Sequence, residues 1–579
     1  MGIVAALVSG CAPSGDHRPT TGVILISLDT LRADHLGCYG GPRPTSPFVD
    51  GLAERGVLFD NCVVQVPGTL PSHMTMLTGL LPAQHAVLPP DGVLSDDIPL
   101  LQEMLAGAGV RTAGFTEGGY VSGRFGFSRG FERFSDDARK SNTDIEDVFV
   151  RGIDFLRSLD DDDRFFLFLH TYAIHDPYYP PPPYTDRYLP DADDRELAGF
   201  EPYPMDGLQP PSPTLRRNQR DRHRAALGFV RSVLPVGAAM PTGPNLVDVN
   251  RGRQPPPSDE VLATYTALYD ATINYVDDVL RSLFYRLGEL GLADRTVVII
   301  TSDHGEEFLE HGRLTHEQVY DECLRVPLVV VGPAVATGRR IPELVMTVDL
   351  TPTILDLLDV APRGTLAGRS LAPALRPEAP VIDDRDAHAV GVVDPSEALY
   401  RRRSGELYQV VVHRLASRDG FPWVEREVEL ESFDGTLELE ILSYHRRRAV
   451  EVEVDGVATT TLEVGVAWQP VTLDLGAAGE KHVIRFRSAS CDSPAEVSDS
   501  RDTRCLAFRI RGFPDRRTEL FDLDRDPESA RDLSAEAPGV ARELLDGLDA
   551  FRRAPVAAAE SAPLDEATLE RLRELGYIQ

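Results

Sequence analysis

The sequence predicts an α/β protein with a largely parallel central sheet flanked by helices, together with a β-sandwich insert and a small C-terminal subdomain. Between Gly22 and Leu375, short apolar segments typical of buried strands alternate with helical segments, which is the pattern of helices on both faces of a parallel sheet. From Trp423 to Phe513, apolar and charged residues instead alternate one by one. That alternation is typical of antiparallel strands with one solvent-exposed face.

The composition is typical of a globular protein. The chain has 579 residues, of which 42% are hydrophobic and 26% are charged, so it is long enough for several domains with large cores. Lys and Arg number 59 and Asp and Glu number 91, and the formal net charge is −32. A surface this acidic argues against binding of nucleic acid or of an anionic membrane by the protein as a whole. We therefore predict no nucleic-acid partner.

Residues 1–22 are predicted to be a lipoprotein signal and a tether. Residues 2–10 are small and apolar, and Val8-Ser9-Gly10-Cys11 resembles a bacterial lipobox. The alternative is a frayed N-terminus, since the apolar stretch is short and lacks the usual positive charges. No apolar run is long enough for a spanning helix. We therefore expect an exported chain, periplasmic or at the cell surface, that meets the membrane only through a lipid anchor at Cys11.

Four apolar segments are expected to be buried strands of the central sheet. They are residues 23–28, 165–169, 297–301 and 328–331. Asp29 follows the first, His170 follows the second, and Ser302, Asp303 and His304 follow the third. Ligands of open α/β sheets bind beyond the carboxyl ends of the strands. These polar residues are therefore the first candidates for a functional site.

The other segments set the predicted domain boundaries. Residues 184–259 are rich in Pro and Arg and are interpreted as an insertion or lid, and apolar residues at helical spacing predict a helix from about Val261 to Leu290. Asp455-Gly456 predicts a hairpin turn. Cys491 and Cys505 could pair if the chain is exported. The predicted units are 1–22, a catalytic domain at 23–395, a β-rich insert at 396–515 and a C-terminal subdomain at 516–579.

Asp29, Asp303 and His304 form a candidate metal site. If strands 23–28 and 297–301 are neighbours, these three side chains meet at one edge of the sheet. Two carboxylates and an imidazole suit a divalent cation such as Mn²⁺, Zn²⁺ or Ca²⁺. An aspartate alone often caps a turn after a strand, but that alternative does not explain His304.

Thr69 is the candidate nucleophile. It precedes a helical segment that reaches Leu81, with Pro71 in the expected first turn. Backbone N–H groups and the helix dipole favour an anion at such a position. A metal that contacts the hydroxyl would favour its alkoxide, so Thr69 is predicted both to bind the metal and to attack the substrate. A helix-capping threonine is the alternative.

His175 and His316 are candidate catalytic histidines. His175 directly precedes Asp176, and His316 lies shortly before Tyr320. Either imidazole could protonate a leaving group or bind an ester oxygen. For each of them, a purely structural role in the core remains the alternative.

Four ordered motifs resemble the sulfatase branch of the alkaline phosphatase superfamily. They are Ile26–His35, Thr69–Gly79, Thr301–Glu306 and Tyr320–Pro327. The resemblance covers about Thr21 to Leu375 and returns near Glu519. It implies an alkaline-phosphatase-like fold with Thr69 at the nucleophile position. It also implies a metal site and two histidines near the scissile group, at Asp29, Asp303, His304, His175 and His316.

The chain departs from the sulfatase pattern at the nucleophile. Sulfatases carry Cys-x-Pro-Ser-Arg, in which the Cys or Ser becomes formylglycine, whereas this chain has Thr69-Leu70-Pro71-Ser72-His73. Threonine is not a substrate for that maturation, so no formylglycine is expected. The sulfate-binding lysines of the family are missing as well, because Lys140 and Lys481 lie outside the matching motifs and Glu117 and His316 stand about where those lysines would be.

The leading functional prediction is a metal-dependent hydrolase of sulfuric or phosphoric esters that uses Thr69 instead of formylglycine. Its expected substrate is an anionic ester, carried for example by a glycan or a lipid. One alternative is a phospho-group transferase of the lipoteichoic acid synthase type, in which an alcohol accepts the group from Thr69. The other is a non-catalytic binding protein on a degenerate sulfatase scaffold. The retained Asp29, Asp303 and His304 argue against the last, because an inactive site has little need for all three.

Overall fold

The computed structural model divides the chain into two compact units. Unit 1 comprises residues 1–316, 322–384 and 555–579, and unit 2 comprises residues 317–321 and 385–554. The structure describes residues 20–136, 145–176, 178, 180–188, 255–316, 318–379, 382–391, 396–414, 424, 426–493, 506–511, 515–526, 529–552, 560–561, 568–569 and 572. The predicted lipobox and most of the predicted lid lie outside these residues. No helix within them is long and apolar enough to cross a membrane.

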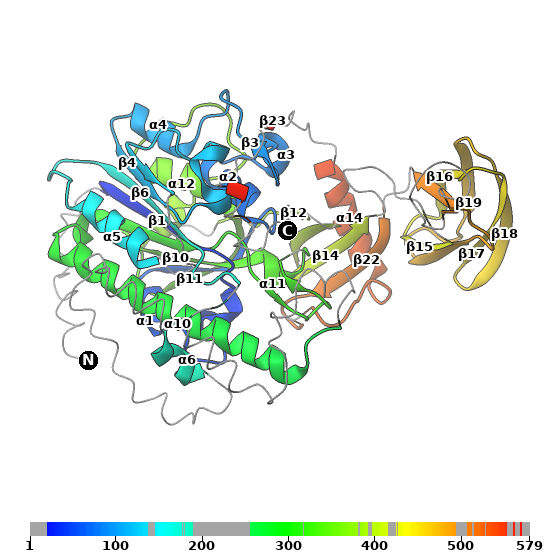
Figure 1. Ribbon diagram of the computed structural model, residues 1–579, viewed down its shortest axis with the longest axis horizontal. Coiled ribbons are helices and arrows are strands. Elements are labelled where there is room, and N and C mark those ends of the chain that lie inside the picture. The colour runs from blue at the N-terminus through cyan, green and yellow to red at the C-terminus, as the bar shows by residue number, and fades with distance from the viewer. Residues whose placement is uncertain are drawn as a thin grey trace. The chain divides into compact units, whose positions relative to one another are not determined.

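The core of unit 1 is an eight-stranded sheet in the order β11-β2-β10-β7-β1-β6-β4-β5 (Figure 1). Its strands are β1 (Gly22–Leu28), β2 (Val57–Val63), β4 (Arg111–Phe115), β5 (Arg133–Ser135), β6 (Phe165–Thr171), β7 (Thr296–Thr301), β10 (Arg325–Val331) and β11 (Arg339–Met346). Strand β1 pairs in parallel with β6 and β7, whereas β10 is antiparallel to both of its neighbours. The predicted largely parallel sheet is therefore confirmed.

Two pairs of short strands complete the β-structure of unit 1. Strand β8 (Glu307–Phe308) pairs with β9 (Leu314–Thr315), and β3 (Gly92–Val93) pairs with β23 (Glu560–Ser561). The second pair joins residues that are far apart in the chain. Residues that follow unit 2 in the chain therefore belong to unit 1.

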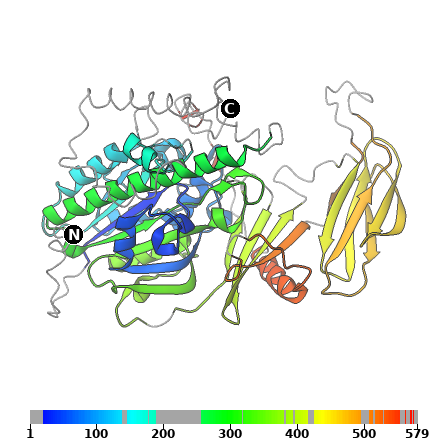
Figure 2. The same cartoon turned by 90° about the horizontal axis from the view of Figure 1, so that it is seen from below.

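The central strands of the sheet have no solvent-facing side, because helices cover them. Every residue of β1, β6 and β7 is buried, as expected for strands covered on both faces. Helices α5 (Ile145–Leu156) and α10 (Asp259–Glu289) run along the same side of the sheet (Figure 2) and share a hydrophobic cluster with α1 (Pro47–Ala53) and alternate residues of β1. Three other helices contact one another: α2 (Thr69–Thr78), α4 (Leu101–Gly107) and α12 (Leu350–Leu357). The short helices are α3 (Pro82–His85), α6 (Pro182–Tyr188) and α11 (Asp321–Leu324).

The long helix predicted near residues 261–290 is confirmed as α10. The Ser258 side chain caps it by accepting a hydrogen bond from the Val261 backbone N–H, which satisfies one of the free donors at a helix start. Helix α6 lies at the start of the predicted lid and packs against α10.

Unit 2 contains an antiparallel sheet covered by one helix. The sheet order is β12 (Ala387–Val390), β13 (Ser396–Arg403), β14 (Glu406–Arg414) and β22 (Asp515–Asp522). Helix α14 (Pro538–Arg552) contributes Leu544 and Leu548 to a hydrophobic cluster with Val410 and Leu520 of the sheet. This sheet and helix bury one shared core.

The rest of unit 2 is the predicted antiparallel sandwich. One sheet has the order β15 (Glu427–Ser432), β20 (His482–Arg487), β17 (Arg448–Val454) and β18 (Val457–Val464), and the other has the order β19 (Gln469–Asp474), β16 (Thr436–Ser443) and β21 (Phe508–Arg511). Alternate residues of these strands share one core. The predicted hairpin turn lies between β17 and β18, where Asp455 and Gly456 both have positive φ. Cys491 is in a disulfide, and its predicted partner Cys505 lies outside the described residues.

Candidate active site

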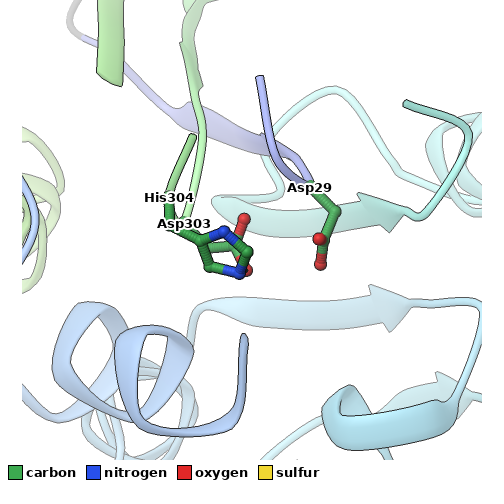
Figure 3. Close-up of side chains that lie close together, drawn as sticks. All are labelled: Asp29, Asp303 and His304. Atoms are coloured by element: carbon green, nitrogen blue, oxygen red, sulfur yellow. The ribbon is translucent and has the colours of Figure 1, made fainter. Parts of the chain in front are cut away.

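Asp29, Asp303 and His304 lie together just beyond the ends of β1 and β7 (Figure 3). The two strands are parallel neighbours, and Ser27 pairs with Thr301 at the end of the ladder. One ligand atom of each of the three side chains lies within 4.8 Å of the other two, and all three residues are buried. The strand adjacency on which the prediction depended is therefore present. Among the described residues, no other group of His, Cys, Asp and Glu meets this geometry.

The oxygen atoms of the two carboxylates fit a cation. Asp29 Oδ2 lies 3.1 Å from His170 Nε2, and Asp303 Oδ1 accepts a 3.3 Å hydrogen bond from the Thr30 backbone N–H. The remaining oxygens, Asp29 Oδ1 and Asp303 Oδ2, are buried and have no hydrogen-bond partner. Buried ionised oxygens without partners are costly. A divalent cation would satisfy both oxygens, so the donor set fits such an ion.

The electrostatics of these groups also favour a cation. Burial raises the pKa of Asp29 well above its usual range, and nearby Asp303, Glu306 and Glu117 raise it further. Burial also raises the pKa of Asp303. Burial lowers the pKa of His304 to about 3, which keeps its imidazole neutral. Positive charge between two such carboxylates offsets their mutual repulsion, and a neutral imidazole can offer a lone pair.

Thr69 is the first residue of α2, and its hydroxyl lies next to the three candidate ligands. Gly68 precedes the helix in an extended conformation, and Thr69 Oγ1 lies 3.3 Å from His304 Nε2. The predicted helix start is therefore confirmed. Backbone N–H groups without intrahelical partners occur in this turn, where they favour an anion. The role of Thr69 in attack and in metal binding stays a prediction.

A chain of aromatic rings extends from His304 past both predicted catalytic histidines. Ring centroids are 4.1 Å apart for His304 and His316, 5.5 Å for His316 and His175, 5.7 Å for His175 and Tyr172, 4.6 Å for Tyr172 and His170, and 4.7 Å for His170 and His73. His175 and His316 therefore lie close to each other, with His316 beside His304. Burial lowers the pKa of His316, and His304 lowers it further, so His316 is neutral near pH 7.

Two histidines at the site make contacts that were not predicted from the sequence. His73 Nδ1 donates a 2.8 Å hydrogen bond to the Thr69 carbonyl oxygen, and its Nε2 lies 2.9 Å from Ser27 Oγ. His170 contacts Asp29, as described above. The position of His170 after the second apolar segment is the signal from which its contact could have been found, because β6 lies beside β1.

Other residue types occupy the positions where the sulfate-binding lysines of the family would be. Glu117 is buried and accepts a 2.5 Å hydrogen bond from the Thr171 hydroxyl. Lys481 lies in unit 2, 3.2 Å from Glu431, and Lys140 lies outside the described residues. Within the part of unit 1 that the structure describes, no lysine is present at the site.

Comparison with known proteins places this chain among the sulfatases. The Sulfatase family model matches residues 21–360. Two relatives from Bacteroides thetaiotaomicron are each 24% identical. They are an N-acetylglucosamine-6-O-sulfatase, which aligns over 65% of this chain and 75% of its own length, and a Delta 4,5-hexuronate-2-O-sulfatase, which aligns over 64% and 74%. Arylsulfatase K of Xenopus laevis is 33% identical over 21% of this chain and 22% of its own.

Solved structures share the same fold. A protein in complex with its substrate D-glucosamine-2-N,6-O-disulfate superimposes with a TM-score of 0.58 and 16% identity, covering 93% of this chain and 98% of that one. The phosphonate monoester hydrolase of Agrobacterium radiobacter gives a TM-score of 0.53 with 17% identity, over 92% and 95% of the two chains. The family match spans more than half of the sequence. The chain is therefore a member of the sulfatase family, the alkaline-phosphatase-like hydrolases of sulfate esters.

Proposed function

We propose that this protein is a metal-dependent ester hydrolase in which Thr69 Oγ1 is the nucleophile and Asp29, Asp303 and His304 hold one divalent cation. The observation that carries the proposal is the pair of partnerless carboxylate oxygens beside His304. His304 Nε2 itself lies 3.3 Å from the Thr69 hydroxyl. The cation, when bound, would lower the pKa of the hydroxyl and offset charge that develops in the transition state.

The residues of the chain supply the remaining steps. Thr69 Oγ1 forms a bond to the sulfur or phosphorus atom while the bond from that atom to the ester oxygen breaks. His316 and His175, which extend the ring chain from His304, are the groups that can take the hydroxyl proton and return it to the leaving oxygen. Water then attacks the sulfur or phosphorus atom and breaks its bond to Thr69 Oγ1, which restores the hydroxyl. The product released is inorganic sulfate or phosphate from a monoester, and a phosphate monoester from a phosphodiester.

Sulfated sugars are the first substrate class to test. The names of the two relatives from Bacteroides thetaiotaomicron refer to sulfate esters of N-acetylglucosamine and of a hexuronate. Phosphoric esters are the second class, because a phosphonate monoester hydrolase shares the fold and threonine replaces the formylglycine precursor. We further propose that the protein is exported and anchored through Cys11, which the lipobox-like sequence supports.

The test is an assay of the chain from Thr20 onward with an aryl sulfate, an aryl phosphodiester and a 6-O-sulfated sugar. Each substrate is tried with Mn²⁺, Zn²⁺ or Ca²⁺, and then with a chelator. We expect metal-dependent release of the alcohol. Thr69→Ala should lower kcat about a thousandfold or more, because the nucleophile is gone.

Thr78→Ala is the matched control, since it makes the same substitution at the other end of α2, where Thr78 Oγ1 donates to the Met74 carbonyl. An unchanged rate in Thr69→Ala would exclude the nucleophile assignment. Transfer of the group to added glycerol would indicate a transferase. Metal binding without turnover of any of the three substrates would favour a binding protein.

A further inference from the structure

Each of the two carboxylates at the site lies against a buried histidine. His170 Nε2 is 3.1 Å from Asp29 Oδ2, and His73 Nδ1 is 3.5 Å from Asp303 Oδ2; all four side chains have 0% exposure. His170 has hydrogen-bonding geometry to its carboxylate, whereas His73 donates to the Thr69 carbonyl instead. His170 is therefore the histidine whose contact bears directly on the orientation of a candidate metal ligand.

We propose that His170 is a positioning residue that orients Asp29 for the divalent cation. An ionised carboxylate only accepts hydrogen bonds, so the contact requires a proton on His170 Nε2. Donation to Oδ2 limits rotation of the Asp29 carboxylate and leaves Oδ1, the oxygen without a partner, for the cation. The inference rests on the metal site of the proposed function and adds a residue outside the predicted ligand set.

The fold holds the His170 ring in the orientation that this contact needs. His170 is part of β6 and pairs with Ser27 of β1, two residues before Asp29. Its ring meets Tyr172 at 89° and His73 at 88°, with centroids 4.6 and 4.7 Å away. Perpendicular ring contacts with two different side chains restrict rotation of the imidazole. The direction of the Nε2–H group is therefore set by packing before any metal arrives.

The effect of His170 should appear in metal affinity and not only in turnover. Residues that hydrogen-bond to metal ligands typically change metal affinity about 10- to 100-fold when they are lost. His170→Phe keeps a ring between Tyr172 and His73 but removes the donor. His170→Gln removes the ring but keeps an N–H donor at a similar reach. The two variants therefore separate the hydrogen bond from the packing.

The experiment is calorimetric titration of the full chain with Mn²⁺ alone, together with the Mn²⁺-dependent shift in melting temperature. We expect His170→Phe to bind Mn²⁺ about 10- to 100-fold more weakly than the unmodified protein, and His170→Gln to stay within about threefold of it. His85→Gln is the control. His85 is a buried histidine of α3 that is hydrogen-bonded to Thr75, near the C-terminal end of α2. If His170→Phe does not fold, His170→Asn replaces it, since its amide is too short to reach Asp29.

The outcomes are distinct. If His170→Phe binds Mn²⁺ as tightly as the unmodified protein, the inference about His170 is overturned and the proposed function is not affected. Equal weakening in the Phe and Gln variants also overturns it, because the N–H donor that the Gln variant keeps would then contribute nothing to metal binding. If the unmodified protein binds none of Mn²⁺, Zn²⁺ and Ca²⁺, the metal site of the proposed function fails and this inference fails with it.

Discussion

Ser72 ties the helix that carries Thr69 to the strand end that carries Asp303. Its hydroxyl donates a 2.7 Å hydrogen bond to the Asp303 carbonyl oxygen, and Ser72 is fully buried. Ser72→Ala removes this bond and should lower the free energy of unfolding by about 1 kcal/mol. It should also lower kcat about 10-fold, because Thr69 is no longer held against the metal ligands.

Thermal unfolding and steady-state kinetics check both effects of Ser72→Ala. Ser282→Ala is the matched control, because Ser282 Oγ donates to the Asp278 carbonyl oxygen on α10, away from the site. If the two variants lose the same stability and neither loses activity, Ser72 has a purely structural role.

Single residues also show where prediction from the sequence stops. Asp29, Asp303 and His304 could be predicted because each follows an apolar strand segment, and parallel strand ends converge. The contact of His170 was not predicted although its position after an apolar segment was a signal for it, because the contact also depends on which strand lies beside β1. The side-chain bonds of His73 depend on the depth to which α2 packs, which periodicity does not report.

At the scale of elements, an ion pair joins the β17–β18 turn to β20. His482 Nδ1 lies 2.8 Å from Asp455 Oδ2, and the Val483 N–H donates to the other oxygen. Burial alone would lower the pKa of His482, but its hydrogen bond with Asp455 raises it above 6.5. Burial alone would raise the pKa of Asp455, but the bond lowers it below 3.8. Both groups are therefore charged between pH 3.8 and pH 6.5, and the ion pair should stabilise the turn over that pH range.

The expected pH profile follows from the two signs. The His482 contribution is complete below pH 6.5 and is lost as the pH rises through the raised pKa, while the Asp455 contribution is lost as the pH falls below 3.8. Because Asp455 is half exposed, the gain is below about 1 kcal/mol. Thermal unfolding of unit 2 from pH 4 to 9 measures it. His482→Gln should flatten the decline above pH 6.5, and an unchanged slope would assign that decline to other groups.

Elements were predicted where periodicity was strong and missed where it was weak. Residues 428–441 alternate except at residues 432–435, and the structure divides them into β15 and β16 around Asp434-Gly435, the same dipeptide that marked the later turn. Strand β18 was not predicted because most of its residues are exposed. An edge strand with both faces in solvent has no apolar alternation to detect.

At the scale of the molecule, one lysine joins the sandwich of unit 2 to its four-stranded sheet. Lys481 Nζ donates to Ser534 Oγ at 2.7 Å and to the Thr518 carbonyl at 3.0 Å, and it lies 3.2 Å from Glu431. Lys481→Met leaves the largely buried Glu431 carboxylate without its cation and should destabilise unit 2 by about 2 kcal/mol. Scanning calorimetry measures this change.

Lys140→Met is the control for loss of a lysine, since these are the only two lysines in the chain. An unchanged transition for unit 2 in Lys481→Met would mean that the sandwich and the sheet are held together by other contacts. At this scale the sequence predicted the sandwich as a unit, but not this connection, because Lys481 and Thr518 are distant in the chain.

The pairing of β23 with β3 has a consequence for biosynthesis. Gly92 emerges from the ribosome long before Ser561, its partner in that ladder. Domains tend to fold during synthesis from the N-terminal side, yet β3, whose sheet consists of β3 and β23 alone, has no partner strand until residue 561 has been made. This ladder therefore forms only after synthesis of unit 2 is complete, and a chain that ends within unit 2 lacks it.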